Sequence, residues 1–119
     1  MKFEFDNERP IYIQIVEKLR IAIVSGYYPP GCKIPSVRDL ALAAKVNPNT
    51  MQKALIELED DKLIYTERTN GKYVTEDKKL LERVKKELSR DIINKFVRDM
   101  ESIGISYEES INYLKELGE

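Results

Sequence analysis

The sequence predicts a mainly α-helical protein with one small β-hairpin near its middle. Over most of the chain, apolar residues recur at intervals of three and four, which is the period of an amphipathic helix. Asn70-Gly71 stands between two short runs rich in strand-forming residues, as in a hairpin. Serine, asparagine or proline precedes several of the helical runs, where these residues cap or start a helix. We therefore expect five helices and a hairpin.

The first helix is predicted to start at Pro10 and to end near Gly26. Its apolar face is expected to consist of Ile11, Ile15, Leu19, Ala22 and Ile23. Segment 27–31 should then be a rigid, non-helical link, because each of its two prolines restricts the residue before it and Gly31 supplies the freedom of a turn.

Two short helices should follow. Ser36 is placed to cap the first of them, with Asp39 three residues on as a weak capping box. Asn47 caps the next, in which Pro48 takes the first position, where its missing N–H costs nothing. This helix should run to about Asp61. The two helices should share a core made of Leu40, Ala41, Ala44, Val46, Met51, Ala54, Leu55 and Leu58.

The hairpin and two more helices complete the chain. Runs 64–68 and 72–75 are the predicted strands, and residues 69–71 are the turn. A long helix should run from Asp77 to near Gly104, and a capping box of Ser106 and Glu109 should start a last helix. The long helix carries an apolar stripe of Leu81, Val84, Leu88, Ile92, Phe96 and Met100, and the last helix carries Tyr107, Ile111, Leu114 and Leu117.

Composition excludes several classes of function. One cysteine and no histidine rule out an intrachain disulfide and a Cys/His zinc site, and they remove the commonest general base. We therefore expect no enzyme, metal or cofactor, and we expect Cys32 to be a buried or half-buried filler. The longest apolar stretch, 11–15, is too short for a membrane span, and the acidic start lacks a secretory signal. A cytoplasmic location is expected.

Helix, short helix, tight turn, helix and hairpin is the order of a winged helix-turn-helix, a DNA-binding fold. We expect this domain over residues 1–76 and a helical dimerisation or effector region over 77–119. The outward face of the third helix should present Asn49, Thr50, Gln52 and Lys53. Asparagine and glutamine can pair with adenine, and lysine can reach guanine or phosphate.

Charge supports DNA binding only locally. The net charge is −1, which gives no argument for nucleic acid as a partner. Between Lys33 and Lys53, however, the one acid is Asp39. Each feature also has a plainer interpretation, since the start of the third helix is ordinary capping chemistry and Arg38 could be a solvated or paired arginine. Lys72, beside the turn, could serve hairpin solubility.

Together, segments 10–12, 34–41 and 46–50 closely resemble the GntR family of bacterial regulators. The resemblance covers about residues 10–75, and Asn47-Pro48-Asn49-Thr50 looks like the YtrA branch, whose C-terminal region is about two helices long. It implies a homodimer on a pseudo-palindromic operator. Where many members have arginine, this chain has Pro48 and Gln52. The resemblance implies DNA contacts by Ser36, Arg38, Asn47, Asn49, Thr50, Gln52, Lys53 and the wing residue Gly71.

The long helix indicates how two copies associate. A helix of about 24 residues is roughly 36 Å long, more than the small winged domain can cover, so a partner helix should bury its apolar stripe. Candidate dimer contacts are Leu88, Ile92, Phe96, Tyr113 and Leu114. A small-molecule effector stays open but unsupported, since the region lacks convergent polar groups.

We therefore expect a dimeric transcription regulator, most simply a repressor, with double-stranded DNA as its partner. Lys72 on the wing is included among the candidate DNA contacts. The alternative is a winged-helix module that binds protein without reading DNA, and the near-neutral charge and the acids that follow Lys53 keep it open. Selection from a random duplex pool separates the two, because a protein adaptor enriches no motif.

Overall fold

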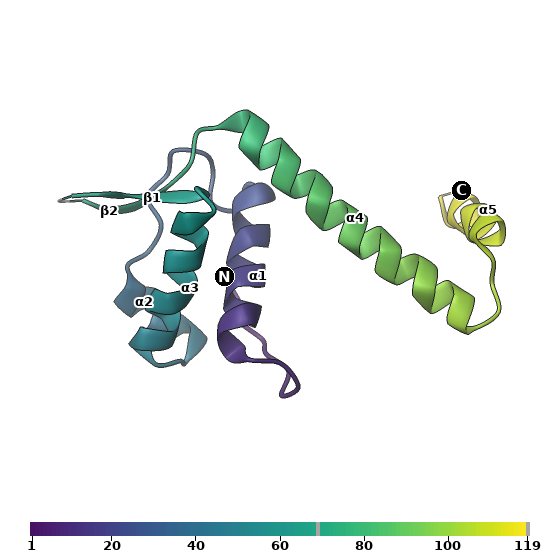
Figure 1. The fold of residues 1–119 in the computed structure, drawn as a ribbon, viewed down its shortest axis with the longest axis horizontal. Helices are drawn as coiled ribbons and strands as arrows, with labels where there is room; N and C mark the ends of the chain where they lie inside the picture. The colour runs from purple at the N-terminus through teal and green to yellow at the C-terminus, as the bar shows by residue number, and fades with distance from the viewer. Residues whose placement is uncertain (69, 119) are drawn as a thin grey trace. The chain divides into compact units, whose positions relative to one another are not determined.

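The computed structural model describes residues 1–68 and 70–118 (Figure 1). The chain divides into two compact units, Met1–Arg83 and Val84–Glu119. The predicted fold class is confirmed: the described residues form five helices and a two-stranded antiparallel hairpin. The elements are α1 (Ile11–Val24), α2 (Val37–Ala44), α3 (Pro48–Asp60), β1 (Ile64–Glu67), β2 (Gly71–Val74), α4 (Lys78–Ser102) and α5 (Tyr107–Leu117).

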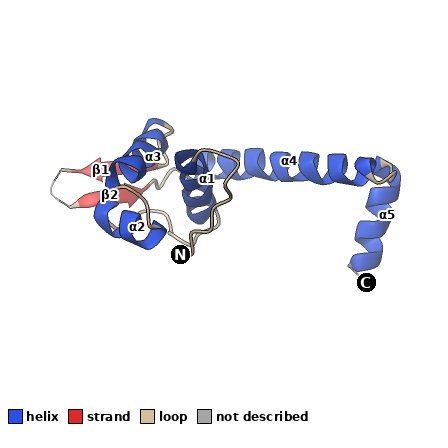
Figure 2. Cartoon of the chain, turned by 90° about the horizontal axis from the view of Figure 1, so that it is seen from below, coloured by secondary structure: helices blue, strands red, loops and turns tan. Residues whose placement is uncertain are grey.

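The core of the first unit forms around α3, which packs against α1, α2 and β1 (Figures 1 and 2). This gives the helix-turn-helix and the wing one common support. The expected core is confirmed for all its members except Val46, which is half-buried at the turn between the two helices. The largest fully buried side chains are Ile15, Leu19, Met51, Leu55, Leu58, Leu63, Ile64 and Val74.

The start of α1 differs from the prediction. Ile11 was expected on the buried face but is 44% exposed, whereas Gln14 is only 2% exposed. The physical reason is the N-terminal arm, which meets α1 through the Gln14 amide. This amide donates hydrogen bonds to the carbonyl oxygens of Asp6 (3.1 Å) and Arg9 (2.9 Å), and it accepts one from the Asp6 N–H (2.9 Å). A buried polar side chain whose hydrogen bonds are made is tolerated in a core.

Segment 31–34 is more than the link that the prolines predict. The Gly31 N–H donates to the Val74 carbonyl, the Val74 N–H donates to that of Cys32, and the Ile34 N–H donates to that of Lys72, each at 2.9 Å. The segment therefore extends the hairpin along β2, and Cys32 is half-buried there, as expected.

The hairpin is shifted slightly from its predicted limits. Its register pairs Ile64 with Val74 and Glu67 with Gly71. Gly71 is therefore the first residue of β2 and not part of the turn, while Arg68 lies outside β1. The reason is that Glu67 pairs with Gly71 as the last partners of the two strands. Thr69, predicted in this turn, lies outside the described residues.

In the second unit, hydrogen bonds between residues close in sequence start α5. The predicted capping box of α5 is confirmed, because Ser106 Oγ accepts from the Glu109 N–H at 3.2 Å and Glu109 Oε1 accepts from the Ser106 N–H at 3.4 Å. The sequence placed a domain boundary between residues 76 and 77, and the two units divide inside α4. None of the helices in the described residues is long and apolar enough to cross a membrane.

Candidate nucleic-acid interface

The turn between α2 and α3 is built by the caps that the sequence predicts. Ser36 Oγ accepts from the Asp39 N–H at 3.1 Å and starts α2, and Asn47 Oδ1 accepts from the Asn49 N–H at 2.8 Å and starts α3. Between them Lys45 takes a left-handed conformation with φ 57°. Capping uses one acceptor of each side chain, so the Ser36 hydroxyl proton and the Asn47 amide N–H groups remain as donors.

The α3 side chains of the predicted interface lie on a broad outer surface of the helix. Asn49 and Lys53 are exposed, while Thr50 and Gln52 are half-buried. Consecutive residues of a helix point about 100° apart, so Gln52 and Lys53 face different sides. The structure therefore brings these groups to one helix but separates them into two flanks.

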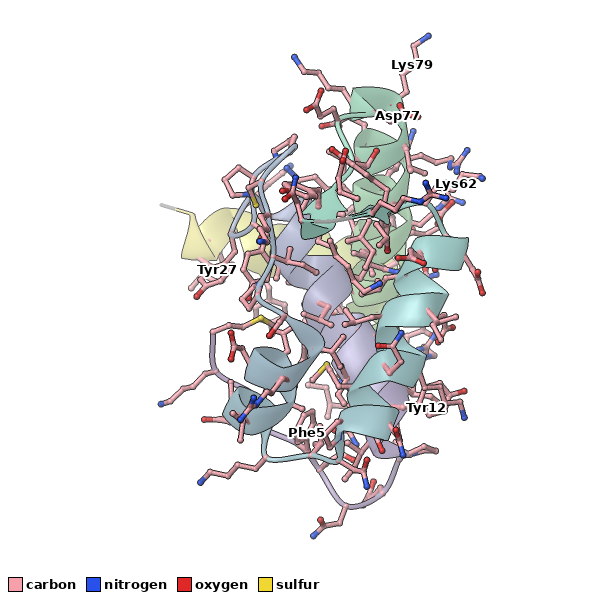
Figure 3. All side chains as sticks on the ribbon, turned by 90° about the vertical axis from the view of Figure 1, so that its left-hand side faces the viewer. Phe5, Tyr12, Tyr27, Lys62, Asp77 and Lys79 are labelled. Atoms are coloured by element: carbon pink, nitrogen blue, oxygen red, sulfur yellow. The ribbon has the colours of Figure 1, made fainter. Side chains whose placement is uncertain are left out.

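Lys53 lies on the flank that faces α1. Its Nζ stands 3.9 Å from the centroid of the Tyr12 ring, within the range of a cation–π interaction. Tyr12 lies in the first turn of α1 and is labelled in Figure 3. Further along the same flank, Arg20 pairs with Asp61 at 2.6 Å.

The opposite flank of α3 meets the wing. Lys72 Nζ donates to Glu59 Oε1 at 2.8 Å and to Thr66 Oγ1 at 2.9 Å, and Thr66 also bonds to Glu59. The hydrogen bonds from Lys72 and Thr66 lower the pKa of the Glu59 carboxyl. Only 17% of the Lys72 side chain is exposed, so this lysine ties the wing to α3. Its contact with DNA stays a prediction.

Two cations near the end of the hairpin were not among the DNA contacts predicted from the sequence. Arg68 is exposed in the connection between the strands. Lys33 runs beside the start of β2, because a Cβ placed on Gly71 would lie 3.0 Å from Lys33 Cε. Gly71 itself has φ +102°, a conformation that favours glycine. The bridge between Lys33 and Tyr73 that brings Lys33 here is non-local, so no sequence signal marks it.

Arg38 lies in the first turn of α2 and is exposed. None of the ion pairs found among residues 1–68 and 70–118 includes it. Its charge is therefore available to DNA, the contact that the family resemblance implies for it. The same described residues contain no group of three or more cysteine, aspartate or glutamate side chains arranged to hold a metal ion.

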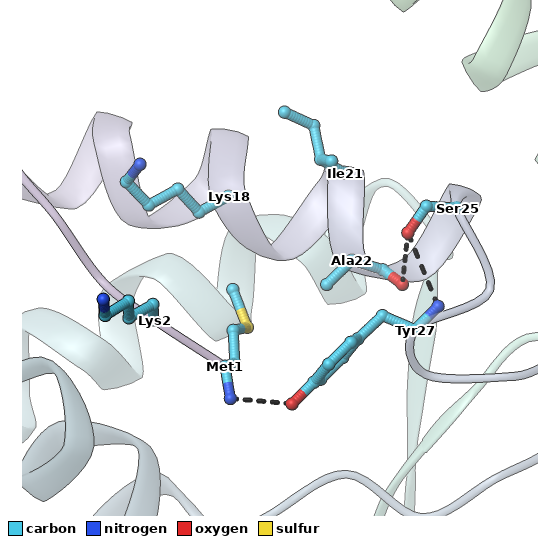
Figure 4. A pocket seen from close by; sticks show the side chains of 7 residues that line it. All are labelled: Met1, Lys2, Lys18, Ile21, Ala22, Ser25 and Tyr27. Carbon is cyan, nitrogen blue, oxygen red and sulfur yellow. Dashed lines mark hydrogen bonds between the residues drawn. The ribbon is translucent and has the colours of Figure 1, made fainter.

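A hollow of about 360 Å³ lies between the N-terminal arm and α1 (Figure 4). The N-terminal amine of Met1 donates to the Tyr27 hydroxyl across it at 2.7 Å. Its lining is Met1, Lys2, Lys18, Ile21, Ala22, Ser25 and Tyr27. This is a mostly apolar surface with few convergent polar groups, so it lacks the polar set that would orient a specific small ligand.

The comparison with protein families identifies the function of this domain. The family model of bacterial regulatory proteins, gntR family, matches residues 11–74, more than half of the chain. The chain belongs to the GntR family. The matched range contains α1, α2, α3 and the hairpin, so this winged helix-turn-helix is the DNA-binding domain of a transcription regulator.

Relatives match beyond this domain. The chain is 34% identical over 115 residues to YhcF of Bacillus subtilis, an uncharacterized HTH-type transcriptional regulator, with 97% of this chain and 95% of YhcF covered. It is 35% identical over 112 residues to the HTH-type transcriptional repressor YtrA of the same organism, with 93% and 86% covered. The predicted resemblance to YtrA-like GntR regulators is therefore confirmed.

Solved structures agree. A GntR family transcriptional regulator from Listeria monocytogenes has a TM-score of 0.85 and 42% identity, with 94% of this chain and 98% of that chain covered. The AraR DNA-binding domain in complex with operator ORX1 has a TM-score of 0.57 and 27% identity, with 63% and 99% covered. The first likeness extends over both units, and the second concerns a domain that holds operator DNA.

Proposed function

We propose that this GntR regulator is a homodimeric repressor that binds a pseudo-palindromic operator, with one half-site for each protomer. One observation carries the proposal: the first two turns of α3 present amide and ammonium groups on a domain of a DNA-binding family. Recognition helices read base edges with their N-terminal residues. The sequence identity to a protein named as a repressor supports a role in repression. A transcription regulator of this bacterial family should act in the cytoplasm.

The DNA-reading domain is proposed to span residues 1–76, with roles divided by chemistry. Asn49 and Gln52 read base edges, since their amides can pair bidentately with adenine. The remaining contacts are to the backbone, where hydroxyl, amide and cationic groups bind phosphate oxygens. They comprise Ser36, Arg38, Asn47, Thr50 and Lys53 on the two helices and Gly71 and Lys72 on the wing, with Lys33 and Arg68 added from their place at the wing.

Dimerisation is proposed for region 77–119. The proposed contacts are Leu88, Ile92, Phe96, Tyr113 and Leu114. Three of them are more than half exposed in the single chain: Ile92 at 67%, Tyr113 at 51% and Leu114 at 53%. Burying such side chains against a second copy stabilises the pair by about 25 cal/mol for each Å² of apolar surface, which supports a second copy as the partner of these helices.

The test begins with the full chain and a pool of random duplexes. We expect an inverted repeat to be enriched, bound by two protomers in analytical ultracentrifugation. Its affinity should fall steeply between 50 and 200 mM salt, by about 10³-fold or more if six or more phosphates are contacted. Enrichment of no motif would contradict the proposal and would favour a protein-binding winged module.

Two matched substitutions distinguish contacts to the DNA backbone from contacts to the bases. Arg38→Ala should weaken binding to every duplex by a similar factor, because a phosphate contact carries no sequence information. Gln52→Ala should instead relax base preference at one position in each half-site, with a loss of about 1–3 kcal/mol on the preferred base. Equal affinities of Gln52→Ala and wild type for all operator variants would show that Gln52 reads no base.

A further inference from the structure

We propose that Tyr12 is a positioning residue for DNA binding. Its ring holds the Lys53 ammonium on the α1 flank of the recognition helix, so that Lys53 meets the DNA backbone. The base edges are left to Asn49 and Gln52. The inference rests on the proposed function, because it takes Lys53 as a DNA contact, and it adds a residue from a helix outside the helix-turn-helix.

The contact between the two side chains carries the first step. Lys53 Nζ lies 3.9 Å from the ring centroid of Tyr12, well inside the limit of about 6 Å for a cation–π interaction. Tyr12 is half-buried in the first turn of α1, while Lys53 is exposed. The ring therefore covers one side of the ammonium only. Its remaining N–H donors are open to a phosphate oxygen.

The surroundings of Lys53 show that the ring competes with an acid. Glu57 is exposed one turn further along α3, at the spacing that favours an ion pair. In α4 the same order and spacing gives a pair, Lys95 to Asp99 at 2.7 Å. No ion pair among the described residues includes Lys53. With its ammonium over the Tyr12 ring, Lys53 stays outside such a pair.

The direction of the side chain carries the second step. Gln52 and Lys53 point about 100° apart around α3. Glu59 lies two helical turns after Gln52 on the same side of α3. Its carboxylate accepts a hydrogen bond from Lys72 of the wing. The flank of Lys53 is the one that meets α1. Asn49 lies one helical turn before Lys53, so the ammonium held on the α1 flank stands beside a base-reading residue, at the edge where a backbone phosphate can meet it.

A double-mutant cycle tests the inference. Operator affinity and its salt dependence are measured for wild type, Tyr12→Leu, Tyr12→Phe, Lys53→Met and the double variant Tyr12→Leu/Lys53→Met. The probes are the duplex selected by the full chain and a duplex of unrelated sequence. Tyr12→Leu should weaken binding to both about two- to fivefold, and Lys53→Met should lower the slope of log affinity against log salt by about 1.

Two comparisons within the cycle are decisive. Tyr12→Phe keeps the ring and should bind like wild type, and Tyr12→Leu should cost nothing further once Lys53 is methionine. Equal losses for Phe and Leu would assign the effect to the hydroxyl and overturn the inference. So would a full loss from Tyr12→Leu in the Lys53→Met background, because the two residues would then act independently.

Fluorinated phenylalanine at position 12 replaces Tyr12→Leu if that variant does not fold. It weakens the attraction of the ring for a cation while keeping the shape, so the same two- to fivefold loss is expected. Unchanged affinity would overturn the inference. If wild type selected no duplex at all, the proposed function would fail together with the inference, whereas additive losses with a normal wild type would overturn the inference alone.

Discussion

The winged unit buries most of its leucines, with Leu42 at 68% exposure as an exception, whereas the last leucines of the C-terminal unit are exposed. In residues 1–83 Leu19, Leu55 and Leu58 are at most 1% exposed, whereas Leu114 and Leu117 in the second unit are 53% and 86% exposed. In both units a serine or asparagine caps the start of a helix: Ser36 and Asn47 in the first unit and Ser106 in the second. The difference is the core. Caps start a helix, but in the single chain several apolar side chains of the second unit stay exposed.

The largest expected effect contrasts one leucine from each unit. Leu55→Ala should lower the free energy of unfolding by about 2–5 kcal/mol, because it leaves a cavity in a close-packed core. Leu114→Ala should have an effect that depends on protein concentration, since its proposed partner is a second chain. Urea unfolding at several concentrations measures both. Equal and concentration-independent losses would remove the distinction between the two units.

The second prediction breaks the proposed dimer. Ile92→Asp should raise the dimer dissociation constant more than tenfold, because an unpaired carboxylate would be buried in an apolar contact at a cost of at least 2 kcal/mol. Sedimentation velocity measures this. Asn94→Asp is the matched control, since Asn94 is exposed on α4 and lies outside the proposed contacts. A dimer that tolerated Ile92→Asp as well as Asn94→Asp would move the interface elsewhere.

The third prediction compares caps. Asn47→Ala should destabilise the winged unit by about 1 kcal/mol, since the Asn49 N–H loses its acceptor. Asn47→Asp keeps an acceptor and should restore stability. Ser106→Ala removes the equivalent cap of α5, and its cost should appear in the dimer equilibrium and not in the unfolding of residues 1–83. Circular dichroism melts and sedimentation together separate the two, and a loss of winged-unit stability in Ser106→Ala would contradict this assignment.

The smallest effect concerns the wing and depends on pH. Glu59 has a pKa below its ordinary value of 4.5 because Lys72 and Thr66 bond to it. A carboxyl with a lowered folded-state pKa stabilises the fold above its unfolded pKa, and the contribution disappears as the pH falls through the lowered value. Glu59→Gln should therefore cost about 0.5 kcal/mol at pH 7, and this cost should disappear as the pH falls through the lowered pKa of Glu59. A cost that stayed constant with pH would show that the charge is not involved.

Local chemistry made most of the fold predictable. The caps at Ser36, Asn47 and Ser106 act within three residues of themselves, so sequence alone reveals them. The burial of Gln14 in place of Ile11 was missed, because it depends on the N-terminal arm. The pairing of segment 31–34 with β2 was missed for a similar reason. Hydrogen bonds between segments that are distant in the sequence leave no periodic pattern in that sequence.

The candidate interface follows the same rule. The outward residues of α3 could be found from helical periodicity. The partners of its two lysines could not, since Tyr12 is 41 positions before Lys53 and Glu59 is joined to Lys72 only across the hairpin. Two amines that look equivalent in the sequence therefore have different tasks. One is held at the border of the recognition surface, and the other fastens the wing.

The left-handed conformation of Lys45, between α2 and α3, affects the stability of the winged unit. A side chain with a Cβ in this conformation is about 1 kcal/mol less stable than glycine, and Lys45 is exposed, with φ 57°. The turn thus trades folding stability for a positive charge beside the recognition helix. Lys45→Gly should therefore raise the stability of the winged unit while removing one positive charge from the turn before the recognition helix.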